Sequence, residues 1–266
     1  MLTTFHVYGD ESIAGNTVVY GLVIVPEEKL ELIETILGDV KERFKASRRT
    51  RFHCREVFHK DARRKTEWSH LTDDGAYELA LTITDNLSGK GLETRIGHVD
   101  RRDIKHEIPG PRGHKSIAIN DAKELIPFAY QGAAGQLVTN DKYNNNRCKL
   151  WVEPNSDIVR WFGSRRHVGR LLKTNFIDSN TGSIATTMTP ENLDSKERPV
   201  LLELADLLAY CSARVLENMY TTKRKRHGDR VVEAIYRSMN PRIGKFKQFD
   251  PEKTKEVVMH PRNYKT

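Results

Sequence analysis

Residues 3–25, TTFHVYGDESIAGNTVVYGLVIV, decide the fold of this chain. Residues 5–10 alternate between two sets of side chains, which would lie on opposite faces of an extended strand. Residues 17–25 form a continuous apolar run rich in β-branched residues, which is typical of a buried strand. A Gly-Asn pair between the two runs is a turn signal. The stretch therefore predicts an antiparallel hairpin whose first strand ends at two adjacent acids, Asp10 and Glu11.

Helical and extended patterns then alternate along the rest of the chain. The apolar spacing predicts helices at 26–45, 72–88, 117–138, 156–172, 198–219 and 229–239, and strands at 92–99, 147–154 and 183–190. A hairpin followed by alternating helices and strands indicates an α/β fold, with a central mixed sheet flanked by helices.

Composition places the chain among polar, globular proteins. It has 266 residues, of which 38% are hydrophobic and 30% charged, and no apolar run approaches the roughly 18 residues that span a bilayer. The first residues show neither the basic region nor the apolar run that is typical of a signal peptide. The three cysteines lie far apart and are odd in number, which favours a reducing compartment over a disulfide framework. We therefore expect a cytoplasmic protein without a membrane partner.

Charge is distributed unevenly along the chain, whose formal net charge is +8. Residues 1–45 hold four Lys and Arg against eight Asp and Glu, whereas residues 207–266 hold fourteen against six. The asymmetry predicts one main domain at 1–219 and a basic, helical C-terminal extension at 220–266. A localised basic surface favours a polyanionic partner such as nucleic acid, the alternative being a merely solvated face.

Two basic clusters are the candidate nucleic-acid contacts. The segment TTKRKRHGDR at 221–230 contains four consecutive cations, and a second pair lies within the predicted helix at 156–172. The candidates are Lys223, Arg224, Lys225, Arg226, Arg165 and Arg166.

Acids occur where the pattern predicts burial. Glu203 and Asp206 lie three residues apart, and so on one face, in a predicted helix that is apolar around nearly its whole circumference. Glu153 ends a predicted apolar strand, as Asp10 ends the first. An unpaired buried carboxylate costs several kcal/mol, so each needs a cation, hydrogen bonds or a metal ion. The spacing leaves open separate salt bridges with arginines or one cluster around Mg²⁺ or Mn²⁺.

Three short motifs occur in order and carry a family resemblance. They are YGDES at 8–12, FHCREVF at 52–58 and LLELADLLAY at 201–210. Together they resemble the prokaryotic and phage domain-of-unknown-function family 3800, which is usually placed in the ribonuclease H-like superfamily. The resemblance implies a ribonuclease H-like fold with an acid-lined, two-metal site for phosphodiester hydrolysis.

The resemblance also suggests roles for individual residues. Asp10, Glu153 and Asp206 match the family's metal-binding acids. The second motif lacks the acid that often precedes its His, because Arg51-Phe52 stands there, and Glu56 is the nearest replacement.

The remaining candidates are second-rank. Glu203 stands where Gln is usual and would either strengthen metal binding or form a salt bridge. Glu11 is a further candidate ligand, and His53 is a candidate proton shuttle.

The sequence thus predicts a metal-dependent nuclease or phosphodiesterase, a hydrolase that acts on DNA or RNA through two Mg²⁺ or Mn²⁺ ions. Two other classes stay open. One is a non-catalytic nucleic-acid-binding or interaction protein on the same fold, and the other is a hydrolase of a small phosphorylated molecule.

Overall fold

The computed structural model of the chain describes residues 3–103, 121–138, 140–144, 146–152, 199–221 and 227–243. Its strands are β1 (Thr4–Ala14), β2 (Thr17–Pro26), β3 (Glu93–Asp100), β4 (Arg147–Val152) and β5 (Arg242–Ile243). Its helices are α1 (Leu30–Arg43), α2 (Cys54–Phe58), α3 (Lys60–Arg63), α4 (Asp73–Leu87), α5 (Ile126–Val138), α6 (Asp141–Asn144), α10 (Leu202–Met219) and α11 (His227–Met239). The helix predicted at 156–172 and the strand predicted at 183–190 lie outside the described residues.

The strands of the described residues form one mixed sheet in the order β4-β1-β2-β3-β5. β1 pairs antiparallel with β2, and β2 antiparallel with β3. β4 runs parallel to β1, and the short β5 runs parallel to β3. The predicted α/β class, hairpin and mixed sheet are therefore confirmed.

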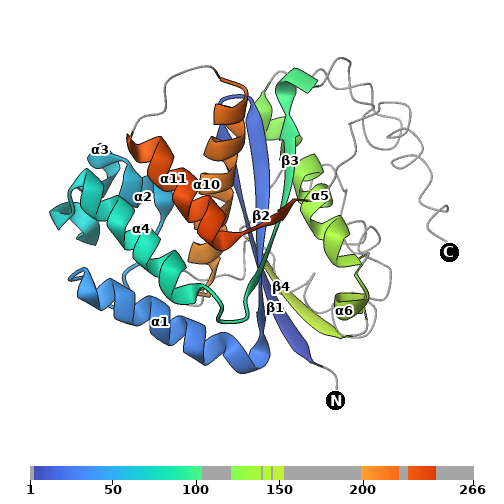
Figure 1. The fold of residues 1–266 in the computed structure, drawn as a ribbon, viewed down its shortest axis with the longest axis horizontal. Coiled ribbons are helices and arrows are strands. Elements are labelled where there is room, and N and C mark those ends of the chain that lie inside the picture. The colour runs from blue at the N-terminus through green and yellow to red at the C-terminus, as the bar shows by residue number, and fades with distance from the viewer. Residues whose placement is uncertain are drawn as a thin grey trace.

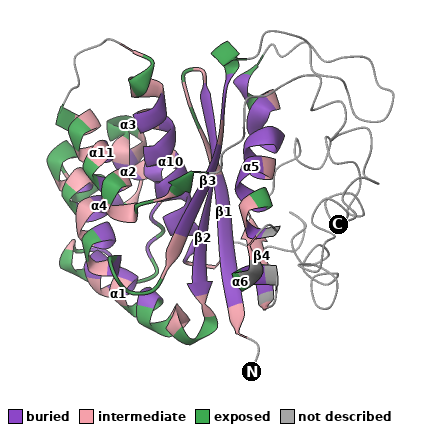
Figure 2. Ribbon diagram, turned by 45° about the vertical axis from the view of Figure 1, so that its right-hand side comes forward, coloured by how far each residue is buried: buried purple, intermediate pink, exposed green. Residues whose placement is uncertain are grey.

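Helices cover the sheet on both faces (Figure 1). One layer contains α1, α2, α4, α10 and α11, and the other contains α5 and α6. Figure 2 shows the long strands buried between the two layers, with exposed residues on the outer sides of the helices.

The first strand is longer than its sequence suggests. β1 does not end at Asp10 but continues through Ala14, which pairs with Thr17 of β2. Gly15 adopts a φ of +59°, which allows the chain to reverse within two residues. The predicted strand end was wrong because residues 10–14 complete the backbone ladder with β2, although the first three are polar.

Side-chain alternation along β1 separates two apolar cores. Phe5 and Val7 pack with α5 on one face of the sheet, whereas Tyr8 packs with α1, α4 and α10 on the other. His6 and Asp10, which share the parity of Tyr8, lie on the α10 face. The alternation therefore directs Asp10 toward the helix that carries the late acids.

Two glycines allow helices to approach the sheet closely. A Cβ on Gly21 would lie 3.2 Å from the backbone nitrogen of Ala209 in α10. A Cβ on Gly97 would lie 2.2 Å from the carbonyl oxygen of Ala129 in α5. Because Gly21 pairs with Asp10, the close contact brings α10 against the sheet beside that acid.

The predicted boundary at 219/220 does not separate α11 from the main domain. Val232 and Ile235 of α11 are buried in the core formed with α4 and α10, and β5 extends the sheet beside β3. The apolar face of α11 explains this packing, since a helix with such a face is stabilised by burying it. Residues 227–243 therefore belong to the same domain, whereas 244–266 lie outside the described residues.

Candidate functional site

Asp10 is a buried carboxylate in a strand otherwise lined by apolar side chains. Its exposed fraction is 8%, and its Oδ1 accepts the backbone N–H of Glu11 at 2.8 Å. This amide occupies one of the about four lone-pair positions of the carboxylate. Asp10 therefore presents its carboxylate on the α10 side of the sheet, within a buried environment.

Asp206 is the second buried acid on the same side of the sheet. It is 7% exposed, and its Oδ2 accepts the backbone N–H of Cys54 at 2.7 Å. Cys54 is the first residue of α2, and the side chain of the preceding His53 makes no capping hydrogen bond. Asp206 therefore supplies the acceptor that satisfies an otherwise orphaned amide at the start of α2.

The thiol of Cys54 shares its surroundings with both acids. Burial raises the pKa of this thiol well above its usual range, and the charges of Asp206 and Asp10 raise it further. Both carboxylates thus act on one buried group, although they are far apart in the sequence. The structure brings these two predicted ligands to the same region.

Glu153 lies outside the described residues, but its neighbour in the sequence is placed. Val152 pairs with Gly9, and Trp151 with Tyr8, in the parallel ladder of β1 and β4. The residue before Glu153 thus pairs with the residue before Asp10.

Glu203 is held in an ion pair. Its Oε2 lies 2.6 Å from Nζ of Lys41 in α1, and both side chains are almost fully buried. The charge of Glu203 is therefore balanced by a lysine, as one of the two sequence-based alternatives proposed. The other alternative, that Glu203 is a metal ligand, stays a prediction.

Glu11 does not lie on the face of Asp10. Adjacent residues of a strand point to opposite sides of the sheet, and Glu11 has the parity of Phe5 and Val7, which pack against α5. Strand parity therefore sets Glu11 apart from Asp10, and its role as a ligand stays a prediction.

His53 and Glu56 lie beside the site at the start of α2. Nδ1 of His53 is 3.6 Å from Oε1 of Glu56, and both side chains are partly exposed. The carbonyl of His53 accepts the N–H groups of Glu56 and Val57 at 2.9 Å each. The pair is thus fixed next to the amide that Asp206 binds.

The described residues contain no group of three or more His, Cys, Asp or Glu side chains arranged to hold a metal ion. Carboxylate oxygens such as those of Asp10 and Asp206 are nevertheless the donors that Mg²⁺ and Mn²⁺ prefer. Two acids from β1 and α10 fit part of such a site, and a further oxygen donor is required. The six predicted nucleic-acid contacts, Lys223, Arg224, Lys225, Arg226, Arg165 and Arg166, also lie outside the described residues.

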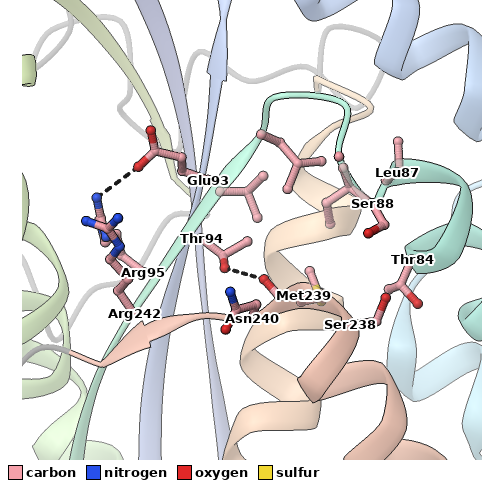
Figure 3. Close-up of a pocket in the computed structure, with 14 residues that line it drawn as sticks. Thr84, Leu87, Ser88, Glu93, Thr94, Arg95, Ser238, Met239, Asn240 and Arg242 are labelled. Atoms are coloured by element: carbon pink, nitrogen blue, oxygen red, sulfur yellow. Dashed lines mark hydrogen bonds and ion pairs between the residues drawn. The ribbon is translucent and has the colours of Figure 1, made fainter.

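The cavity in Figure 3 lies elsewhere, between the end of α4, the start of β3 and the end of α11. Its volume is about 290 Å³, and hydroxyl groups line part of its wall. The hydroxyl of Thr94 donates to the carbonyl of Met239 at 2.7 Å across it. None of the predicted site residues lines this cavity.

Sequence reasoning missed Lys41 and Arg214. Lys41 occupies a position of the apolar stripe of α1, four residues after Leu37 and eight after Ile33, which are both buried. A lysine in an apolar stripe is a sequence signal for a buried acidic partner. Arg214 lies eight residues after Asp206 and therefore on a neighbouring face of α10. This spacing could have been read from the sequence.

No helix among the described residues is long and apolar enough to cross a membrane. Comparisons of the chain with family models, with curated proteins and with solved structures found no match.

Proposed function

We propose that the protein is a metal-dependent nuclease of the ribonuclease H-like type, related to domain-of-unknown-function family 3800. The observation that carries the proposal is the different pairing of two acids one turn apart in α10. Glu203 is neutralised by Lys41, whereas Asp206 forms no ion pair with Lys or Arg among the described residues and accepts a backbone amide. A buried carboxylate with this environment is suited to bind a cation.

The position of Asp10 supports the same proposal. Asp10 and Asp206 both act electrostatically on Cys54, and two nearby carboxylates repel each other unless a proton or a cation compensates them. The mixed sheet flanked by helices agrees with the fold that the resemblance implies. We propose Glu153 as a third ligand because the residues before it and before Asp10 are paired.

Each residue then has a defined part in phosphodiester hydrolysis. Asp10, Asp206 and Glu153 would hold Mg²⁺ or Mn²⁺, and bound ions of this kind activate water and stabilise the leaving oxygen. His53 would take the proton of the attacking water, with Oε1 of Glu56 lying 3.6 Å from its Nδ1. The water oxygen becomes bonded to phosphorus while the P–O ester bond breaks.

A cleavage assay with matched variants tests the proposal. Labelled single-stranded and double-stranded DNA and RNA are incubated with the full chain in Mn²⁺, in Mg²⁺ and in EDTA. Metal-dependent cleavage is expected from the wild type and is expected to be lost in Asp10→Asn and Asp206→Asn. The Lys41→Met/Glu203→Leu double variant should retain cleavage, since it replaces an ion pair that holds no metal.

The outcomes separate the other function classes. Binding of nucleic acid without cleavage in any metal would identify a non-catalytic binding protein. Hydrolysis of bis(p-nitrophenyl) phosphate alone, without cleavage of any polynucleotide, would identify an enzyme that acts on small phosphate esters. Cleavage that survives in both Asn variants would overturn the proposed carboxylate site.

A further inference from the structure

Three aromatic side chains from three helices form a stacked column beside the acids. The ring of Phe58 in α2 lies 5.3 Å from that of Tyr77 in α4 and 5.1 Å from that of Tyr210 in α10. The interplanar angles are 24° and 17°, so the three rings are nearly parallel. Packing from three helices holds the rings in place, since aromatic pairs at such separations stabilise each other.

The column fixes the guanidinium group of Arg214. Its Nη1 donates a hydrogen bond to the hydroxyl of Tyr210, and its central carbon lies 5.0 Å from the centre of that ring. Both contacts restrict the rotamers of a side chain that is flexible elsewhere. Arg214 is therefore a preorganised cation.

Arg214 lies along the same helix as the acid. Asp206, Tyr210 and Arg214 succeed one another at intervals of four residues along α10, which puts Arg214 about 12 Å from Asp206 along the helix axis. A bound strand carries a phosphate at every nucleotide along its length. A cation at this distance can therefore contact a phosphate other than the one at the acids.

Arg55 and His59 lie near Arg214, and Arg55 carries a second positive charge. Burial lowers the pKa of His59, and the charges of Arg214 and Arg55 lower it further, so both arginines act on the same side chain. Within the part of the chain that the structure describes, no ion pair joins any of the three to a carboxylate. Like charges assembled without acidic partners cost free energy, which a bound anion would recover.

Arg64, which follows α3, shows how an ordinary surface arginine is paired. Its Nη1 lies 3.7 Å from Oδ1 of Asp61, and its side chain is 64% exposed. An exposed arginine with an acid at hand contributes little to stability and is largely neutralised. The contrast separates Arg214 from a merely solvated surface charge.

We propose that Arg214 and Arg55 bind backbone phosphates of a polynucleotide, and that the Tyr77–Phe58–Tyr210 column positions Arg214 for this contact. The inference rests on the proposed function, because it assigns the substrate contacts that flank the Asp10 and Asp206 site. The ligand is an anionic phosphodiester strand. These residues would not recognise its sequence, since phosphate contacts carry no sequence information.

Binding measured in EDTA tests the inference without relying on cleavage. The fluorescence anisotropy of a labelled single-stranded DNA is titrated with the full chain from about 50 to about 200 mM salt. Arg214→Gln should weaken binding about tenfold and lower the slope of log K against log salt by about 0.7. Arg64→Gln, the matched control with the same charge change, should alter neither affinity nor slope.

Two further variants separate charge from geometry. Arg214→Lys should retain the wild-type slope, because the charge remains, yet bind more weakly, because the planar fork is lost. Tyr210→Phe keeps the ring and removes the hydroxyl that holds Arg214, so its affinity should fall while its slope stays near that of the wild type. Unchanged thermal unfolding in each variant shows that the fold is retained.

The result also separates this inference from the proposed function. If Arg214→Gln binds DNA as the wild type does while the wild type cleaves in Mn²⁺, the phosphate contact is overturned and the nuclease proposal stands. If binding depends on Arg214 but no metal supports cleavage, the contact stands and the catalytic proposal falls. Equal effects of Arg64→Gln and Arg214→Gln would also overturn the inference.

Discussion

Lys41 and Glu203 form a buried ion pair between α1 and α10, with Nζ 2.6 Å from Oε2. The two residues are separated by 162 positions in the sequence, 203 minus 41. The pair neutralises the acid that precedes Asp206 by one helical turn. It therefore distinguishes Glu203, which is compensated within the protein, from Asp206, which forms no ion pair with Lys or Arg among the described residues.

Breaking this pair from one side should destabilise the fold. Lys41→Met or Glu203→Leu alone leaves one buried charge uncompensated, at an expected cost of about 3–5 kcal/mol in the free energy of unfolding. The double variant removes both charges and should recover most of this loss. Urea unfolding of the four proteins gives the coupling energy, and additive losses in the double variant would contradict the pairing.

Asp206→Asn and Asp206→Ala should differ in stability although both lose activity. Asn keeps an oxygen that can accept the Cys54 amide and removes the charge near Asp10, so its metal-free melting temperature should equal or exceed that of the wild type. Ala leaves a buried N–H without its acceptor, which should cost about 1–3 kcal/mol.

The metal response provides the control for this comparison. Mg²⁺ or Mn²⁺ should raise the melting temperature of the wild type by mass action and that of Asp206→Asn much less. Unfolding of Asp206→Asn in all buffers would instead show that the charge of Asp206 is needed for the fold.

Asp100 should make stability depend on pH in the acid range. Burial alone would raise the pKa of its carboxyl, but hydrogen bonds from Arg102 and Thr17 outweigh burial and hold this pKa below the usual 3.8. Because the folded-state pKa lies below the unfolded-state value, the stabilisation is complete above about pH 4 and is lost as pH falls through the folded-state pKa. Asp100→Asn should therefore cost about 1.5–3 kcal/mol at pH 7 and progressively less below pH 3.8.

Urea unfolding of the wild type and of Asp100→Asn at matched pH values checks this. A difference between the two proteins that stays constant from pH 7 down to pH 3 would contradict the assigned pKa direction.

The basic segment 223–226 should contribute to the binding of polynucleotides. Changing its four cations to Ala should lower the salt slope of binding by roughly 3, because each lost phosphate contact lowers the slope by about 0.7 to 0.9. Affinity should fall evenly across sequences, while metal binding at the acids stays the same.

A variant with four exposed cations changed elsewhere is the control for charge alone. The positions are Arg64, Lys65, Lys90 and Lys123. A slope that falls equally in both variants would show that binding follows net charge and not this segment.

Local patterns in the sequence determined much of the framework. The alternation in residues 5–10 and the apolar run at 17–25 predicted the hairpin, and the apolar spacing of 198–219 predicted α10. These elements could be predicted because period-2 and period-3.6 patterns report which side chains a strand or helix must bury. The same patterns identified Asp10 and Asp206 as acids in buried surroundings, which the structure confirms.

Only the tertiary structure decided how those acids are compensated. Glu203 and Asp206 look alike in the sequence, and their difference arises because Lys41 of α1 lies beside one and the Cys54 amide beside the other. The continuation of β1 past Asp10 likewise depends on its pairing with β2. Periodicity records what a residue's own element buries, whereas the partner of a buried charge comes from a segment far along the chain, and only folding brings the two together.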